Sequence, residues 1–176
     1  MVVYLSEYIA KYYTSSTGNR LIAVSWSLVG IGFAVGPFLF GYLSKHIGNK
    51  NALLTSLTCL GTGTLLLSFG LSEWKIYLFS LFASLGLIST ASLYSSINSI
   101  NSDKLSVYRS WQYILIGGAA TLLLGSIIFE QIIIHFSYSY VFVFGALMNY
   151  LALIISLKIK KPTHEIGDKI PKNQLV

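Results

Sequence analysis

Residues 21–50 read LIAVSWSLVGIGFAVGPFLFGYLSKHIGNK, an apolar run that carries no charged side chain up to Ser44 and then turns basic. A helix needs about 20 apolar residues to cross the ~30 Å hydrocarbon core of a bilayer. The run from Leu21 to Ser44 meets that length, and the basic residues after it suit the interface between lipid and water. This segment predicts a transmembrane helix that ends in a short turn.

Further charge-free stretches follow, at residues 51–72, 76–102, 110–129 and 131–157. Backbone polar groups must be hydrogen-bonded inside lipid, so apolar runs of this length predict helices. Strands of a membrane β-barrel would instead alternate in polarity over about 10 residues. We therefore expect an all-α, polytopic membrane helix bundle with five full spans, near residues 21–44, 52–71, 76–99, 111–134 and 139–157.

The composition excludes several classes of protein. Hydrophobic residues make up 54% of the 176-residue chain and charged residues only 10%, against about 25% charged in a soluble domain. This argues against an ordinary soluble enzyme, a disordered chain and, with Cys59 as the one cysteine, a disulfide scaffold. The net charge of +6 does not indicate nucleic acid, because the basic residues are scattered between apolar runs. The expected partner is the lipid bilayer.

Residues 1–20 and 158–176 flank the predicted bundle of residues 21–157. Tyr4, Tyr8 and Tyr12 recur every four residues and so share one helical face. We interpret this segment as the outer end of a helix whose beginning is missing, followed by a turn at residues 16–19. Residues 158–176 are basic and contain two prolines, which predicts a solvated tail.

The distribution of lysine and arginine predicts the orientation. If successive loops alternate sides, one side carries nine of the twelve basic residues and the other carries Lys11, Arg20 and Lys75. Cytoplasmic loops are the ones enriched in Lys and Arg. We therefore expect a multi-pass protein of the cell membrane with a cytoplasmic C-terminus. The nine residues are Lys45, Lys50, Lys104, Arg109, Lys158, Lys160, Lys161, Lys169 and Lys172.

The loop at residues 41–50, GYLSKHIGNK, follows a Gly-Pro pair at residues 36–37. It resembles the cytoplasmic loop motif of the major facilitator superfamily, roughly G-x-L-x-D-R-x-G-R-K. The matching residues are Gly41, Leu43, Gly48 and Lys50, while Lys45, His46 and Asn49 depart from the pattern. Independently of the family, we expect Gly41 to allow close helix approach and Gly48 to supply the positive φ of a tight reversal.

The resemblance implies the second half of a facilitator-type fold. Residues 1–16 would be the end of helix seven, and the five spans would be helices eight to twelve. The implied function is alternating-access transport of a small solute with proton or ion coupling, together with a missing first half or a second copy of the chain. Two alternatives stay open: a stand-alone structural or accessory membrane protein, and an inactive transporter remnant.

In this family the first, fourth, seventh and tenth helices line the central cavity, and the third predicted span here would be the tenth. That span carries a narrow stripe of small and polar side chains, which either packs against another helix or lines a cavity. The same choice applies to the tyrosines, which either line the mouth of a cavity or form an interfacial belt. The stripe consists of Ser80, Ser84, Ala91, Ser95 and Asn98.

Glu130 is a carboxylate in an apolar context, which makes it a functional candidate. It lies about 30 Å along the helix from Ser110, so it is either an interfacial anchor or a proton-coupling group. Gly118 and Gly125 share a face of the same span and predict a close helix contact. We find no phosphate loop, no metal-ligand cluster and no catalytic triad spacing, so we expect no enzyme, metal or cofactor.

Overall fold

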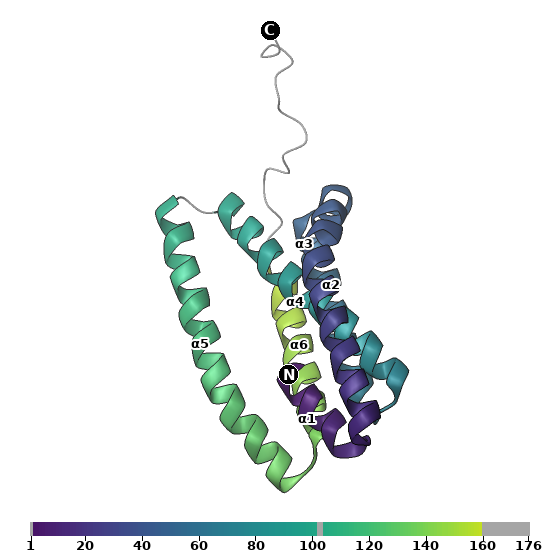
Figure 1. The fold of residues 1–176 in the computed structure, drawn as a ribbon. Helices are drawn as coiled ribbons and strands as arrows, with labels where there is room; N and C mark the ends of the chain where they lie inside the picture. The colour runs from purple at the N-terminus through teal and green to yellow at the C-terminus, as the bar shows by residue number, and fades with distance from the viewer. Residues whose placement is uncertain (1, 102–103, 160–176) are drawn as a thin grey trace, which may run out of the picture.

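The structure is a computed structural model that describes residues 2–101 and 104–159, and in these ranges it contains helices and no strands. The all-α class predicted from the sequence is therefore confirmed. The elements in chain order (Figure 1) are α1 (Val2–Tyr12), α2 (Ser15–Ile47), α3 (Asn49–Ser68), α4 (Glu73–Asn101), α5 (Lys104–His135) and α6 (Tyr138–Leu157).

Five of these helices, α2 to α6, are long and apolar enough to cross a membrane, as far as the described residues go. Helix α1 has 11 residues and rises only about 16 Å, roughly half of the hydrocarbon core. Over residues 2–101 and 104–159 the fold is thus a polytopic helix bundle with five membrane-length helices and one short N-terminal helix. The predicted basic tail lies outside the described residues from residue 160 onward.

The helices extend beyond the apolar runs that predicted them. Helix α2 has 33 residues and rises about 50 Å, so its ends pass the ~30 Å core on one or both sides. Polar residues at its two ends are compatible with a helix that continues into the headgroup region. Helix α3 behaves differently, because it ends at Ser68, before the run does, where Gly70 turns the chain with φ of 92°. Charge-free length therefore predicts the spans better than the helix ends.

The turn expected at residues 16–19 is wrong. Helix α2 begins at Ser15, and the chain reverses one step earlier, at Tyr13 and Thr14. Thr14 is extended, with φ of −60° and ψ of 154°, and its carbonyl accepts a hydrogen bond from the Gly18 amide at 2.7 Å. Gly18 is buried in the first turns of α2 and does not form the bend. Small polar residues signal turns only statistically, and here the helix absorbs them.

Close approach through small residues builds the centre of the bundle. Helix α4 packs most extensively against α3 and α2, and α6 packs against α3 (Figure 1). A Cβ added to Gly86 would lie 2.6 Å from the Ser56 carbonyl oxygen, and one added to Gly63 would lie 2.8 Å from Phe82 Cβ. Helices in lipid associate by such close packing, because lipid tails are as apolar as the side chains and provide no hydrophobic driving force between helices.

Two buried clusters hold the ends of this core. The cluster nearer the α2 N-terminus joins α1, α2, α3, α4 and α6, whereas the other joins α2, α3 and α4 near the basic turn. The first includes Leu5, Tyr8, Ile9, Leu21, Leu67, Ile76, Phe79 and Phe142, and the second includes Phe40, Ala52, Leu53, Leu57, Leu93 and Ile97.

Gly41 does not provide the close helix approach expected of it. A Cβ on Gly41 would meet nothing within 4 Å, whereas one on Gly36 would lie 2.8 Å from the Leu85 carbonyl oxygen. The face of α2 that meets α4 contains Gly32, Gly36 and Phe40, spaced four residues apart. Gly41 follows Phe40 by about 100° of helical rotation and so points away from that face.

Helix α5 stands apart from the packed helices over much of its length in Figure 1, and its described side chains are mostly exposed. The close contact expected at Gly125 is wrong, since a Cβ there would meet nothing within 4 Å. The surroundings of Gly118 are not among those that the structure describes. Helix α5 is therefore held by contacts to α4 and α6 and, near its C-terminal end, by Tyr4 of α1, as described below.

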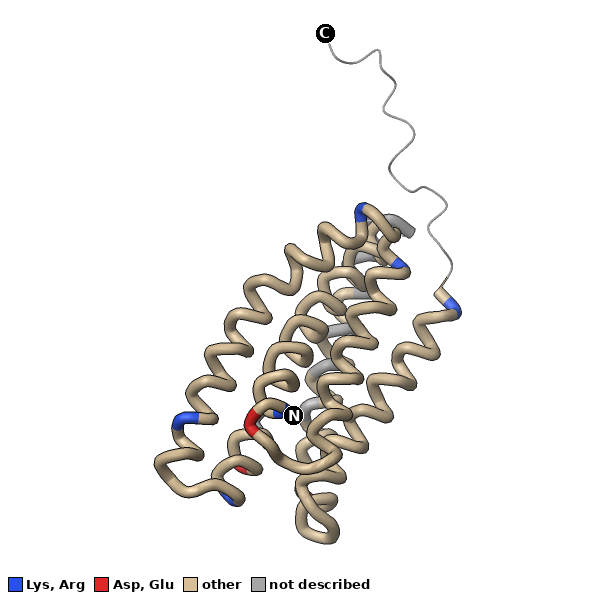
Figure 2. The backbone as a smooth tube through the Cα atoms, turned by 90° about the vertical axis from the view of Figure 1, so that its right-hand side faces the viewer, with Lys and Arg blue, Asp and Glu red and all other residues tan. Residues whose placement is uncertain are grey.

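Charged residues of the described chain gather largely toward the two ends of the bundle, with an uncharged middle (Figure 2). At one end Arg20 on α2 lies 3.5 Å from Glu73 on α4, an exposed ion pair. At the other end the Lys50 ammonium donates a hydrogen bond to the Leu157 carbonyl oxygen at 2.7 Å. Successive described loops therefore lie at opposite ends, as the alternation used for the charge count requires.

Candidate functional site

The basic turn between α2 and α3 depends on Gly48. Its φ of 81° and ψ of 153° lie in a region that is open essentially only to glycine. Its amide donates to the Ser44 carbonyl oxygen at 2.9 Å and its carbonyl accepts from the Ala52 amide at 3.0 Å. One residue thus ends α2 and begins α3, and the positive φ predicted from the sequence is present.

The other residues of the loop motif divide into anchoring and exposed side chains. Leu43 packs against the buried cluster beside the turn, and Lys50 holds the C-terminal end of α6. Lys45 and His46 are exposed, with the His46 ring 4.7 Å from the Tyr42 ring. The motif therefore ties helices together from one side and presents basic groups on the other.

The residues of the polar stripe of α4 differ in burial from one end of the stripe to the other. Ser80 and Ser84 are fully buried, and their hydroxyls donate to the carbonyl oxygens of Ile76 and Ser80 on the same helix. Ser84 lies against Gly32 of α2, where a Cβ would overlap its side chain. These two residues therefore pack between helices in this structure.

Further along α4, Ser95 and Asn98 are half-buried and Ala91 is exposed. This end of the stripe is accessible from outside the packed core, so here both sequence interpretations stay open. The Ser56 and Thr90 hydroxyls form a hydrogen bond at 2.9 Å between α3 and α4, a polar contact that the stripe did not reveal. Its two partners lie on different helices, so no single-helix pattern exposes it.

The three tyrosines of α1 have three different environments. Tyr8 is buried, shares a 2.8 Å hydrogen bond with the Ser139 hydroxyl and stacks on Tyr138 with ring centroids 5.4 Å apart. Tyr12 is exposed at the end of α1, as an interfacial aromatic would be. Tyr4 is half-buried and points toward α5. A shared face therefore did not mean a shared role.

Tyr4 connects α1 to α5. Its hydroxyl donates to the Ser126 carbonyl oxygen at 3.4 Å, and its ring meets Phe129 edge-on with centroids 5.4 Å apart. Phe129 in turn meets Phe144 of α6 at 6.0 Å. This series of three rings links α5 to α1 and α6.

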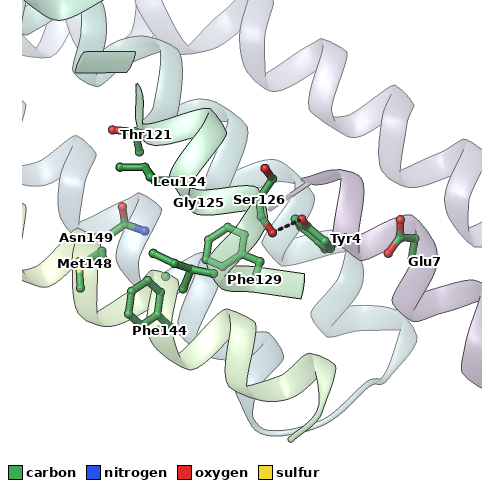
Figure 3. A pocket seen from close by; sticks show the side chains of 12 residues that line it. Tyr4, Glu7, Thr121, Leu124, Gly125, Ser126, Phe129, Phe144, Met148 and Asn149 are labelled. Carbon is green, nitrogen blue, oxygen red and sulfur yellow. Dashed lines mark hydrogen bonds between the residues drawn. The ribbon is translucent and has the colours of Figure 1, made fainter. Parts of the chain in front are cut away.

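A pocket of about 660 Å³ opens where these three helices meet (Figure 3). Its walls are mostly apolar, and its polar side chains lie toward its two ends, with Glu7 beyond Tyr4 and Asn149 and Thr121 opposite. The lining residues come from α1 (Tyr4, Glu7), from α5 (Thr121, Leu124, Gly125, Ser126, Ile128, Phe129) and from α6 (Phe144, Gly145, Met148, Asn149).

Of the predicted site residues, only Tyr4 lines this pocket. Phe129, Phe144 and Met148 are ordinary apolar residues within spans, and nothing in their local sequence distinguishes them. Glu7 is recognisable in the sequence as a carboxylate within a tyrosine-rich helix. A pocket made by three helices cannot be found from the periodicity of one.

Glu130 is exposed on α5, next to Phe129 and one turn and a half from the helix end at His135. It lies close enough to Tyr4 to act on it electrostatically. Among the described residues the Glu130 carboxylate makes no ion pair. The ion pair that these residues do contain joins Arg20 of α2 and Glu73 of α4. Its assignment as anchor or coupling group stays a prediction.

The described residues contain no group of His, Cys, Asp and Glu that could hold a metal ion. The family model described as Major Facilitator Superfamily matches residues 1–175 of the chain. No curated protein and no solved structure matches it.

Proposed function

Because the chain belongs to the Major Facilitator Superfamily, we propose that it forms one half of a secondary transporter that moves a small solute by alternating access. The observation that carries the proposal is the match along almost the whole chain together with five membrane-length helices. Members of this family pair two six-helix halves around a site near the bilayer midplane. The chain would rock against a second bundle of the same kind.

The order of the helices supports this assignment. With α1 as the end of helix seven, α2 to α6 become helices eight to twelve and the basic turn lies between eight and nine. The tenth position falls on α4, whose half-buried Ser95 and Asn98 would face the partner bundle. The partner is either a first half or a second copy of this chain. Coupling to protons or ions would use Glu130, a carboxylate exposed on α5.

We expect α4 to contact the partner bundle through Ser95. In a Cys59→Ala background, Ser95→Cys should form a disulfide with the same cysteine of a second copy, or with a cysteine placed on the facing helix of a separate six-helix chain, and give a band of larger mass. The physical reason is that a polar face is better placed against protein than against lipid. The readout is gel mobility after oxidation in native membranes.

The matched control is Ser84→Cys, because that position is fully buried against α2 and should not cross-link. A monodisperse monomer whose position 95 faces lipid, as judged by a spin label, would favour the stand-alone alternative. Transport is then read in vesicles loaded with a mixture of small solutes. At least one solute should leave these vesicles faster than it leaves protein-free vesicles, and its release should be saturable. This should occur only in vesicles whose protein forms the pair that cross-links at position 95. Equal leakage from protein-free vesicles would reject the transporter.

We also propose that the protein lies in the cell membrane with the basic turn and the C-terminus in the cytoplasm. Asn51 at the α3 end of that turn and Asn19 at the opposite end of the bundle are both exposed, which makes them a matched pair for labelling. In a Cys59→Ala background, Asn19→Cys should react with an impermeant thiol reagent in intact cells. Asn51→Cys should react only after the cells are opened, and the reverse pattern would refute the orientation.

A further inference from the structure

The pocket between α1, α5 and α6 lies within this one chain, and none of its lining residues belongs to α4, the helix that the proposed function turns toward a partner bundle. We propose that it binds an organic cation with an apolar body. The proposal goes beyond the transport function and is tested by binding alone.

The walls fit an apolar body of drug-like size. The volume of about 660 Å³ falls within the roughly 300–1,000 Å³ of pockets that hold small organic ligands. Leu124, Ile128 and Met148 supply aliphatic surface, and Phe129 and Phe144 supply aromatic rings. In lipid such walls favour a ligand through van der Waals packing and shape, because lipid tails are as apolar as the walls.

The charge in the pocket selects the sign of the ligand. Glu7 is the charged residue of the lining, which contains no lysine or arginine. Lys11, one turn further along α1, lies over the Tyr138 ring at 5.4 Å and makes no ion pair with Glu7. The Glu7 carboxylate is exposed and interacts with the Tyr138 hydroxyl through a hydrogen bond. Among the described residues no cation forms an ion pair with it, so a cationic ligand in the pocket would be attracted to this negative group.

The aromatic rings add to the same preference. Tyr4, Phe129 and Phe144 form a continuous series, each meeting the next edge-on at 5.4 Å and 6.0 Å. Ring faces attract cations, with about 0.5–2 kcal/mol per contact depending on desolvation. At the other end, the Asn149 amide donates to Thr64 Oγ1 at 3.4 Å. An anion would thus meet a carboxylate and ring faces, with little to attract it.

The test compares two probes of nearly the same shape and opposite charge, tetraphenylphosphonium and tetraphenylborate. The full chain is placed in lipid nanodiscs, and binding is measured by equilibrium dialysis against empty nanodiscs, which corrects for partition into lipid. We expect saturable binding of the phosphonium, at least tenfold tighter than binding of the borate. Equal binding of the two probes would mean a merely apolar pocket and would overturn the proposal.

Two variants locate the site. Glu7→Gln should weaken phosphonium binding at least tenfold, while Glu73→Gln, a carboxylate outside the pocket, should leave it unchanged. Gly125→Leu should abolish binding by filling the pocket, since a Cβ there meets nothing within 4 Å and the fold should persist. Gly117→Leu is its matched control, because Gly117 lies on the same helix with equally open space and is not part of the lining.

Each result decides the matter. Full phosphonium affinity in Gly125→Leu would place the bound cation elsewhere and overturn the proposal, and so would full affinity in Glu7→Gln. Loss of binding in both variants with both controls intact would support it. Because no flux is measured, failure of the transport assay leaves this outcome untouched, and failure here leaves the transporter proposal standing.

Discussion

Replacing Gly86 by alanine is expected to destabilise the bundle by about 3 kcal/mol, near the upper end of the usual effect of overpacking a core. The added Cβ would lie 2.6 Å from the Ser56 carbonyl oxygen and 2.9 Å from the Leu60 amide nitrogen. Both atoms belong to the backbone of α3, so no side-chain rotation can relieve the contact. Helices α3 and α4 would have to move apart along their most extensive interface.

The measurement is unfolding by a denaturing detergent in mixed micelles, followed by circular dichroism. Gly30→Ala is the matched control, because a Cβ at Gly30 meets nothing within 4 Å. Alanine there should be neutral or stabilising by up to about 1 kcal/mol through helix propensity. If both variants unfold at the same detergent fraction, the close approach at Gly86 is not what holds the two helices.

Gly48→Val is expected to lower the free energy of unfolding by about 2–3 kcal/mol. A side chain at φ of 81° and ψ of 153° is strained, and a β-branched residue is among the least suited to a positive φ. The strain would fall on the residue that both ends α2 and begins α3. The same detergent titration, together with the yield of membrane-inserted protein, measures it.

Two further variants, one near the end of α2 and one at the start of α3, calibrate this result. Gly41→Val, in open space on α2, should change stability by less than 1 kcal/mol or so. Lys50→Ala removes the 2.7 Å hydrogen bond to the Leu157 carbonyl and should cost about 1 kcal/mol. That exceeds the negligible effect expected of a free surface charge. If valine at position 48 is tolerated as well as alanine at position 50, the turn does not depend on glycine.

The Lys50 contact illustrates what the local sequence leaves out. The motif indicated a basic residue near the membrane surface, and its placement at the turn is as expected. Its acceptor, Leu157, lies at the far end of the chain, and nothing near position 50 encodes that pairing. The same holds for Gly36 and Gly41, two similar glycines of α2. One is pressed against α4 and the other meets nothing, because the helix turns them to different sides.

The sequence by itself determined the membrane class, the five spans and the glycine-dependent turn at position 48. Each depends on a local property: an apolar run long enough to cross lipid, or a backbone angle that favours one residue type. Only the tertiary structure decided that Ser84 packs against Gly32 and that Tyr4, Tyr8 and Tyr12 have different environments. It also decided that α1, α5 and α6 together line a pocket. Lipid drives every span into a helix but gives little preference for which apolar faces meet, so those pairings follow from shape complementarity between helices distant in sequence.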